Sequence, residues 1–152
     1  MPESARQFVG AIALLRRDAD EGSRWLAQWN PGRQRLQFIE AHKLEGESFR
    51  DSLVREIAWT SGLRTGKDYI VSSVPRAHLE VQTEPAGTVF VAEFYLVELM
   101  GRSAIATLDA DGRNRWLAPD EILAGGTADG VLFCENQRML LRKTEVIQPW
   151  ET

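Results

Sequence analysis

Apolar residues near the start of the chain fall in short runs that predict strands. Residues 8–15 (FVGAIALL) form an almost unbroken apolar run, which is typical of a strand buried on both faces. Residues 24–29 and 36–39 follow, and residues 30–32 (NPG) between them are typical of a tight turn. We therefore expect the chain to begin with a buried strand followed by two strands around a turn.

A change of period predicts the first helix, from Ser48 to about Ser61. Apolar residues recur there at the spacing of one helical face: Phe49, Leu53, Val54 and Ile57. Ser48 is a suitable N-cap because its hydroxyl accepts from a free backbone N–H of the first turn. Gly62 is a suitable end because glycine adopts the left-handed conformation that closes many helices.

The rest of the chain alternates between strand and helix patterns. We expect strands at 69–74, 77–83, 88–100 and 115–117, a turn at 84–87, a short helix opened by Pro119 and an amphipathic helix at 132–146. Residues 88–100 are apolar on both alternating faces, as in a strand covered on both sides. This order predicts an α/β fold, an α/β/α sandwich with a mixed sheet.

Composition limits the number of domains and the kinds of partner. The 152 residues are 43% hydrophobic, enough for one globular core, and we expect a single domain over residues 1–152. No stretch approaches the ~20 apolar residues of a membrane-spanning helix and the N-terminus lacks an export signal, so we expect a cytoplasmic protein without a membrane partner.

The net charge of −4, with scattered basic residues, argues against a nucleic-acid polymer as partner. A small phosphorylated ligand needs only two or three cations, for which several arginines are available: Arg33, Arg35, Arg50, Arg55 and Arg76.

Charged residues and glycine recur at a fixed spacing around the first predicted helix. In the pattern G-x5-E-x7-R-E-U-x-E-E-x-G-U, where U is a bulky aliphatic residue, the chain matches six of nine specified positions: Glu47, Arg55, Glu56, Ile57, Gly62 and Leu63. This pattern is the box of the Nudix hydrolases, which the chain therefore resembles. The three departures are Ala41 for glycine and Trp59 and Thr60 for two glutamates. Residues 115–122 (RWLAPDEI) also resemble a segment that often follows the box in that family.

The resemblance implies a Nudix fold and a role for each retained residue. In the family the box glutamates on the helix hold Mg²⁺ or Mn²⁺ against a pyrophosphate, and of these only Glu56 is retained. Glu47 and Arg55 hold the loop and the helix together by an ion pair. The predicted catalytic residues are thus Glu56, Glu47 and Arg55, with Glu56 as the metal ligand.

A single carboxylate is a weak anchor for a hard cation, which prefers several oxygen ligands. If one lost supporting group costs ~10- to 100-fold in metal affinity, two lost ligands cost about 10⁴-fold, or ~5.5 kcal/mol. Other acids are candidates to replace them: Glu47, Glu45, Asp51, Glu93, Glu98, Asp120 and Glu121. Glu93 stands out because it lies in the middle of an apolar strand, where an unpaired carboxylate is costly. Its alternative explanation is an edge position or a salt bridge.

Trp59 has two interpretations. At about 100° per residue, Glu56, Trp59 and Thr60 share a face of the helix beside its buried stripe, so the indole occupies space where the family has a carboxylate. Trp59 then either fills the metal site by packing, which we favour, or offers a stacking surface to a flat ligand. The predicted ligand-binding residues are Trp59, Arg50 and Glu93.

Two functions fit these observations. The first is a Nudix-like domain that has lost efficient hydrolysis and binds a nucleotide or another small ligand with no cofactor. The second is a divergent, Mg²⁺- or Mn²⁺-dependent pyrophosphohydrolase that cleaves a nucleoside diphosphate linked to another group. A structural or assembly module is a third, less favoured alternative. The resemblance further implies a homodimer.

Overall fold

The computed structural model describes residues 7–83 and 87–148, and most of the turn expected at 84–87 lies outside them. Eight strands and four helices follow one another in the order β1 (Gln7–Ala19), β2 (Gly22–Asn30), β3 (Arg35–Gln37), β4 (Glu40–His42), α1 (Phe49–Ser61), β5 (Tyr69–Val71), β6 (Ala77–Gln82), β7 (Val89–Leu99), α2 (Arg102–Ala110), β8 (Asn114–Leu117), α3 (Pro119–Ala124) and α4 (Glu135–Thr144). In the described part of the chain, no helix is long and apolar enough to cross a membrane.

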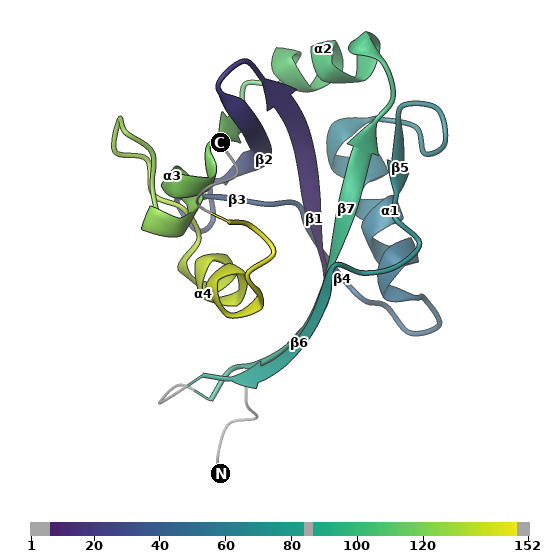
Figure 1. Cartoon of the computed structure of the whole chain (residues 1–152). Coiled ribbons are helices and arrows are strands. Elements are labelled where there is room, and N and C mark those ends of the chain that lie inside the picture. Colours follow the sequence, from purple (N-terminus) through teal and green to yellow (C-terminus); the bar gives the residue numbers. More distant parts are fainter. Residues whose placement is uncertain (1–6, 84–86, 149–152) are drawn as a thin grey trace.

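The strands form one mixed sheet, as predicted. Its main path runs β3-β2-β1-β7-β5, with β4 paired to β1, β6 to β7 and β8 to β2. The central pair, β1 and β7, is parallel over nine residue pairs from Gln7↔Val89 to Leu15↔Val97. Every other pairing of named strands is antiparallel. The two central strands cross the middle of the molecule in Figure 1.

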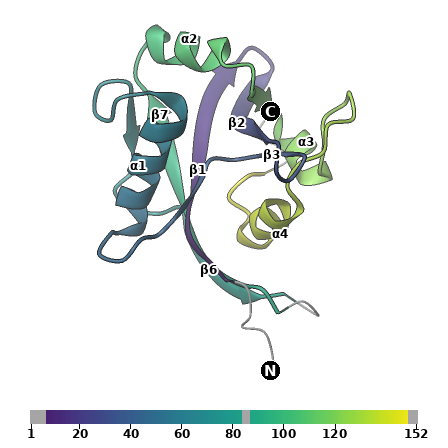
Figure 2. The same ribbon diagram turned by 180° about the vertical axis from the view of Figure 1, so that it is seen from behind.

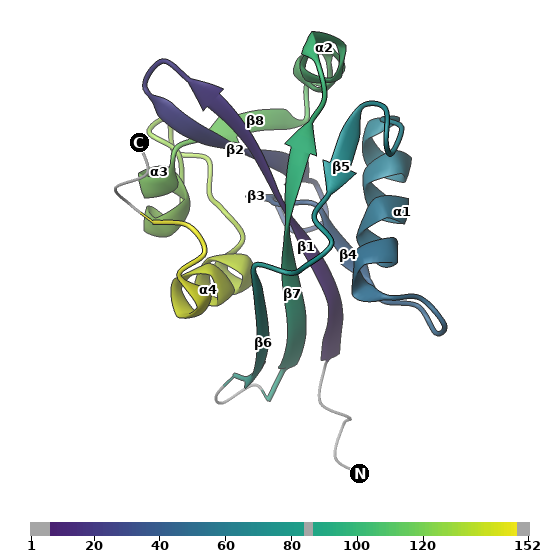
Figure 3. The same ribbon diagram turned by 45° about the vertical axis from the view of Figure 1, so that its right-hand side comes forward.

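Helices cover both faces of this sheet and confirm the α/β/α sandwich. Helix α1 lies on one face, and α3 and α4 lie on the other (Figures 1 and 3). Seen from behind, the same layers appear in reverse order (Figure 2). Side chains alternate along β1, so that Ile12 and Leu14 belong to the core beneath α4 while Ala13 and Leu15 belong to the core beneath α1.

The predicted first helix is confirmed together with both of its ends. Ser48 Oγ accepts from the backbone N–H of Asp51 at 3.0 Å, and Gly62 has a φ of 75° and donates its N–H to the Ala58 carbonyl at 2.9 Å. Leu53 and Ile57 are fully buried against the sheet. The box segment thus forms a loop, a capped helix and a glycine turn.

Several elements differ from the sequence-based expectation. Strand β4 was not predicted, because three residues are too few for a recognisable pattern. Helix α2 was not predicted, because it has no side-chain N-cap and no acidic residue in its first turn. The final helix begins at Glu135 rather than at residue 132, because Leu132 and Phe133 form bridges with Gly126 and Leu36.

Candidate functional site

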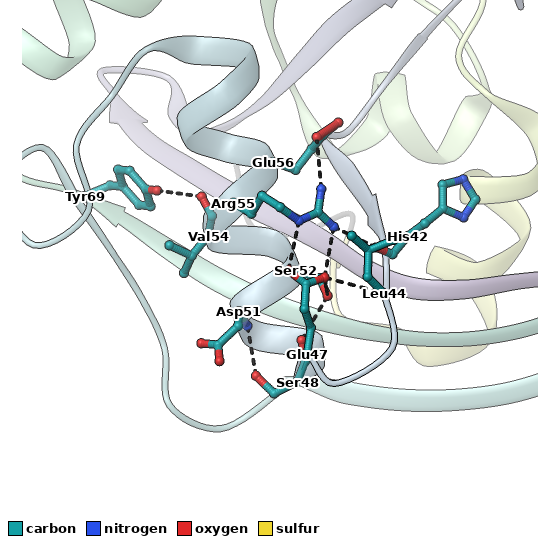
Figure 4. A network of polar contacts seen from close by, with 10 residues as sticks. All are labelled: His42, Leu44, Glu47, Ser48, Asp51, Ser52, Val54, Arg55, Glu56 and Tyr69. Atoms are coloured by element: carbon teal, nitrogen blue, oxygen red, sulfur yellow. Dashed lines mark hydrogen bonds and ion pairs between the residues drawn. The ribbon is translucent and has the colours of Figure 1, made fainter.

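The predicted Glu47–Arg55 pair connects the box loop to helix α1 (Figure 4). Arg55 Nε donates to Glu47 Oε2 at 2.9 Å, and Arg55 Nη2 donates to Glu47 Oε1 at 3.1 Å and to the His42 carbonyl at 2.9 Å. Ser52 Oγ and the backbone N–H of Leu44 also donate to Glu47 Oε1. The Glu47–Arg55 pair therefore fixes the loop, the helix and the end of β4.

These contacts stabilise the ionised form of Glu47. The hydrogen bonds from Arg55, followed by those from Ser52 and Leu44, lower the pKa of Glu47 from 4.5 to about 2. The same pair raises the pKa of Arg55. Each group stabilises the charged form of the other, which suits a structural role for Glu47 and Arg55.

A polar cleft lies between helix α1 and the ends of β2, β3 and β4. Its cavity measures about 270 Å³ and is lined by Gln28, Trp29, Asn30, Pro31, Gln37, Phe38, Ile39, Glu40, Glu56, Thr60 and Arg113. Glu56 and Thr60 come from successive turns of α1, so the box helix forms one wall. We call this cavity the box cleft.

Thr60 joins α1 to the sheet inside the box cleft. Its hydroxyl donates to Gln28 Oε1 at 3.0 Å, and its backbone carbonyl accepts from Arg113 Nη2 at 2.9 Å. Gln28 is 8% exposed, and its Nε2 has no hydrogen-bond partner among residues 7–83 and 87–148. That nitrogen has less than 1 Å² of exposed surface, so a ligand in the cleft reaches it only if the Gln28 side chain moves.

Three charged side chains line the box cleft, and two of them have close partners outside its lining. Glu40 Oε1 accepts from Arg33 Nη1 at 3.2 Å and from Gln137 Nε2 at 2.7 Å. Arg113 pairs with Asp111, whose Oδ2 lies 2.6 Å from Nη2. Glu56 has one ion pair among the described residues, a 3.9 Å contact to Arg55 Nη1, and that guanidinium is already bound to Glu47.

The packing interpretation of Trp59 is wrong. The residue is 84% exposed and does not line the box cleft, whereas Glu56 and Thr60 do. The helical geometry gives the reason. Trp59 lies at about 160° from buried Ile57 around the helix axis, on the opposite side of Glu56 from the apolar stripe. Its indole therefore points to solvent.

Arg50 and Glu93 are placed away from the box cleft. Arg50 Nε and Nη2 donate to the carbonyl of Val71 at 3.2 and 2.9 Å, and Nε also donates to the carbonyl of Ser72. Glu93 accepts from the Tyr95 hydroxyl at 2.6 Å and lies 2.9 Å from His78 Nδ1, on the cross-strand neighbour. Glu93 thus has the salt-bridge environment that was its alternative explanation, and ligand binding by Arg50 and Glu93 stays a prediction.

Sequence reasoning missed Gln28, Glu40 and Arg113. Glu40 directly precedes Ala41, the first box position, on a three-residue strand too short to be recognised. Gln28 lies in an otherwise apolar strand segment, where a buried amide signals a polar partner. Arg113 lies in a polar turn, where Asp111 Oδ1 accepts from its N–H at 3.0 Å, and nothing local in the sequence signals that its side chain reaches helix α1.

The donor set of the box cleft does not fit a tightly held Mg²⁺ or Mn²⁺. Such ions take several oxygen ligands, carboxylates above all. Of the two carboxylates here, Glu40 is bound to Arg33, and the wall opposite α1 offers amides. Among the described residues, no three His, Cys, Asp or Glu side chains converge as a metal site requires.

A second cavity adjoins the box cleft at Glu40. It measures about 280 Å³ and lies under α4, lined by Gln7, Phe8, Ile12, Arg33, Glu40, His42, Thr88, Phe90, Asn136, Gln137 and Leu140. Phe8 and Phe90 supply aromatic surface with ring centroids 6.4 Å apart. The two cavities share Glu40 in their lining.

Comparisons with known proteins find no match to a family model and none to a curated protein sequence. Solved structures do match. The Ap4A hydrolase of C. elegans superposes with a TM-score of 0.60 at 14% identity, covering 93% of this chain and 97% of that one. A NUDIX hydrolase from Nitrosomonas europaea gives a TM-score of 0.56 at 19% identity, covering 93% and 88%.

NrtR of Shewanella oneidensis, solved with a 27mer DNA, gives a TM-score of 0.62 at 12% identity. The match covers 90% of this chain and 59% of that one. These structures share the mixed sheet and flanking helices described above. The chain has the fold of the Nudix superfamily.

Proposed function

We propose that this protein is a Nudix-fold domain that binds a small polar ligand in the box cleft without a divalent cation and without efficient hydrolysis. The proposal rests on where the side chains of the box helix lie. Thr60 is bonded to Gln28 and Arg113, and Trp59 points to solvent, so that Glu56 is the carboxylate of α1 that lines the cleft. The position that holds metal in the family instead connects α1 to β2.

The polar lining of the box cleft supports binding of a polar ligand. The side chains of Gln28, Asn30, Gln37 and Glu56 all belong to that lining. The box cleft, at about 270 Å³, has room for a small ligand such as one base or one sugar. Nucleotides and their parts are therefore the first compounds to test.

The net charge and the structural similarity to NrtR both bear on partners other than a small ligand. The net charge of −4 argues against DNA. NrtR, however, was solved with DNA, so the expected exclusion of nucleic acids does not extend to every protein that contains this fold. A homodimer remains part of the proposal, on the family resemblance alone.

The second candidate is a divergent pyrophosphohydrolase, and Glu40 favours it. This carboxylate lines the box cleft together with Glu56. If Arg33 released it, two carboxylates would face the same space. A hydrolase built this way requires both Glu40 and Glu56 for turnover.

Differential scanning fluorimetry with a compound panel separates the two candidates. The panel contains nucleosides, nucleoside mono- and diphosphates, ADP-ribose and dinucleotides. Each compound is measured once in EDTA and once in about 5–10 mM Mg²⁺, a concentration that would fill a weak metal site. Phosphate release is measured in the same samples. The proposal predicts stabilisation in EDTA by at least one compound, loss of that shift in Gln28→Leu, and no release. Mg²⁺-dependent release that is abolished in Glu56→Gln would instead establish the hydrolase.

A further inference from the structure

A third cavity lies where β2, β3 and β8 meet the loop between α3 and α4. It measures about 520 Å³ and is lined by Trp29, Gln34, Arg35, Leu36, Gly112, Arg113, Arg115, Gly130, Val131 and Leu132. Among the residues that the structure describes, every charged side chain of this lining is an arginine. The cavity therefore carries positive charge on a chain whose net charge is −4. We call it the arginine cleft.

The strand pairing brings the three arginines together. Strands β3 and β8 both pair with β2, and they flank it on opposite sides. The N–H of Trp29 on β2 donates to the Arg113 carbonyl at 2.8 Å, and Arg35 lies on β3 beyond the other side of β2. Since neighbouring strands lie about 4.8 Å apart, the backbones of Arg35 and Arg113 are about 10 Å apart. Two arginine side chains can reach one anion across that distance.

Each arginine keeps hydrogen-bond donors that the described residues do not use. Arg35 donates from Nη1 to one backbone carbonyl and has no ion pair among residues 7–83 and 87–148. Arg113 binds Asp111 through Nε and Nη2, and Arg115 binds Asp129 through both Nη atoms. The side chains of Arg113 and Arg115 are 50% and 39% exposed, so a ligand can approach them. Asp111 and Asp129 do not belong to the lining of the cleft.

We infer that the arginine cleft binds the phosphoryl group of a small phosphate monoester. Guanidinium N–H groups form strong, charge-assisted hydrogen bonds with phosphoryl oxygens. A phosphoryl group presents three acceptor oxygens, so it can accept from arginines that approach from different strands, whereas a carboxylate presents two. Trp29 offers an aromatic surface to the carbon part of the ester. Asp129 competes with the ligand for Arg115 and therefore limits the affinity.

Glycerol 3-phosphate and malonate test this preference, because both carry about two negative charges at about pH 8. We would titrate ¹⁵N-labelled protein with each compound in metal-free buffer without a chelator, since a chelator is itself a polyanion. The backbone amides of Gly130, Val131 and Leu132 are followed by NMR, because they line the arginine cleft and not the box cleft. The expected result is saturable binding of the phosphate with a dissociation constant of about 1 mM or tighter. Malonate should bind about fivefold more weakly or less.

Two variants should change the affinity for glycerol 3-phosphate in opposite directions. Arg35→Gln removes the arginine that has no ion pair and should weaken binding about tenfold. Asp129→Asn releases Arg115 and should tighten binding about threefold. Arg102→Gln is the matched control, because it removes the same charge from an exposed position at the start of α2, and it should leave the affinity unchanged. A gain in one variant and a loss in another cannot both come from a damaged fold.

Each contrary outcome overturns a stated part of the inference. Absence of a saturable shift at Gly130, Val131 and Leu132 overturns the site. Equal weakening by Arg35→Gln and Arg102→Gln also overturns it, because the anion would then respond only to net charge. Equal affinities for glycerol 3-phosphate and malonate overturn the preference for a phosphoryl group. None of these results bears on metal-free binding in the box cleft, which is followed separately at the amides of Glu56 and Thr60.

Discussion

The hydroxyl of Thr60 donates to Oε1 of Gln28 at 3.0 Å and thereby joins helix α1 to strand β2 across the box cleft. In the family pattern the position of Thr60 carries a glutamate that holds metal. Here a neutral hydroxyl makes a hydrogen bond within the protein, and this bond adds to the packing of Leu53 and Ile57 that holds the helix on the sheet.

Removing that hydroxyl should destabilise the fold. Thr60→Val keeps the shape of the side chain but leaves the buried Gln28 amide without its partner, which costs about 1–3 kcal/mol. Thr60→Ser keeps the hydroxyl and should lose less. Urea unfolding monitored by tryptophan fluorescence measures the difference, and equal stability of the valine and serine variants would contradict this role of Thr60.

Two tryptophans should respond oppositely to truncation. Trp59 is 84% exposed, so Trp59→Ala should change the free energy of unfolding by no more than about 0.5 kcal/mol. Trp25 is 3% exposed in the core beneath α4, so Trp25→Ala should cost about 3–5 kcal/mol. A large loss of stability in Trp59→Ala would restore the packing interpretation.

The Glu47–Arg55 pair should make the fold sensitive to acid. Because folding lowers the pKa of Glu47 from 4.5 to about 2, its contribution is present above about pH 4.5 and is lost as the pH falls towards 2. Glu47→Gln should therefore be less stable than the natural protein at pH 7, and the gap should narrow towards pH 2. Asp129, whose pKa is also lowered to about 2, titrates in both proteins. Its contribution to the free energy of unfolding is therefore the same in both and does not affect the gap. Guanidinium unfolding at several pH values measures the gap; a gap independent of pH would mean that the charge of Glu47 does not stabilise the fold.

Restoring the two missing glutamates should restore metal binding. In Trp59→Glu/Thr60→Glu, three carboxylates on α1 supply the oxygen ligands that a hard cation prefers. With a dissociation constant of about 1 mM, 10 mM Mg²⁺ would raise the stability by about 1.4 kcal/mol. Adding Glu56→Gln to this variant should abolish the gain. Thermal unfolding with and without Mg²⁺ checks both variants, and the absence of a gain in the first would show that more than the box residues has changed.

The sequence predicts the fold better than it predicts the site, for a physical reason. Strand and helix periods are local signals, and Ser48 and Gly62 define both ends of α1 by backbone chemistry alone. The cleft instead depends on contacts between distant elements: Gln28 and Thr60 are 32 positions apart, and Arg113 reaches Thr60 across 53. The direction of Trp59 depends on where the apolar stripe of α1 packs, and that becomes visible only when the helix is placed on the sheet.

The affinity of the natural protein for Mn²⁺ decides whether the box cleft holds a divalent cation. Free Mn²⁺ counted by electron paramagnetic resonance during a titration gives this affinity without any assumption about ligand or substrate. We expect a dissociation constant weaker than about 10 mM, since two carboxylates of the box are missing and the loss is ~10⁴-fold. A site tighter than about 0.1 mM that is lost in Glu56→Gln would contradict the account and show that Glu40 or another acid completes the metal site.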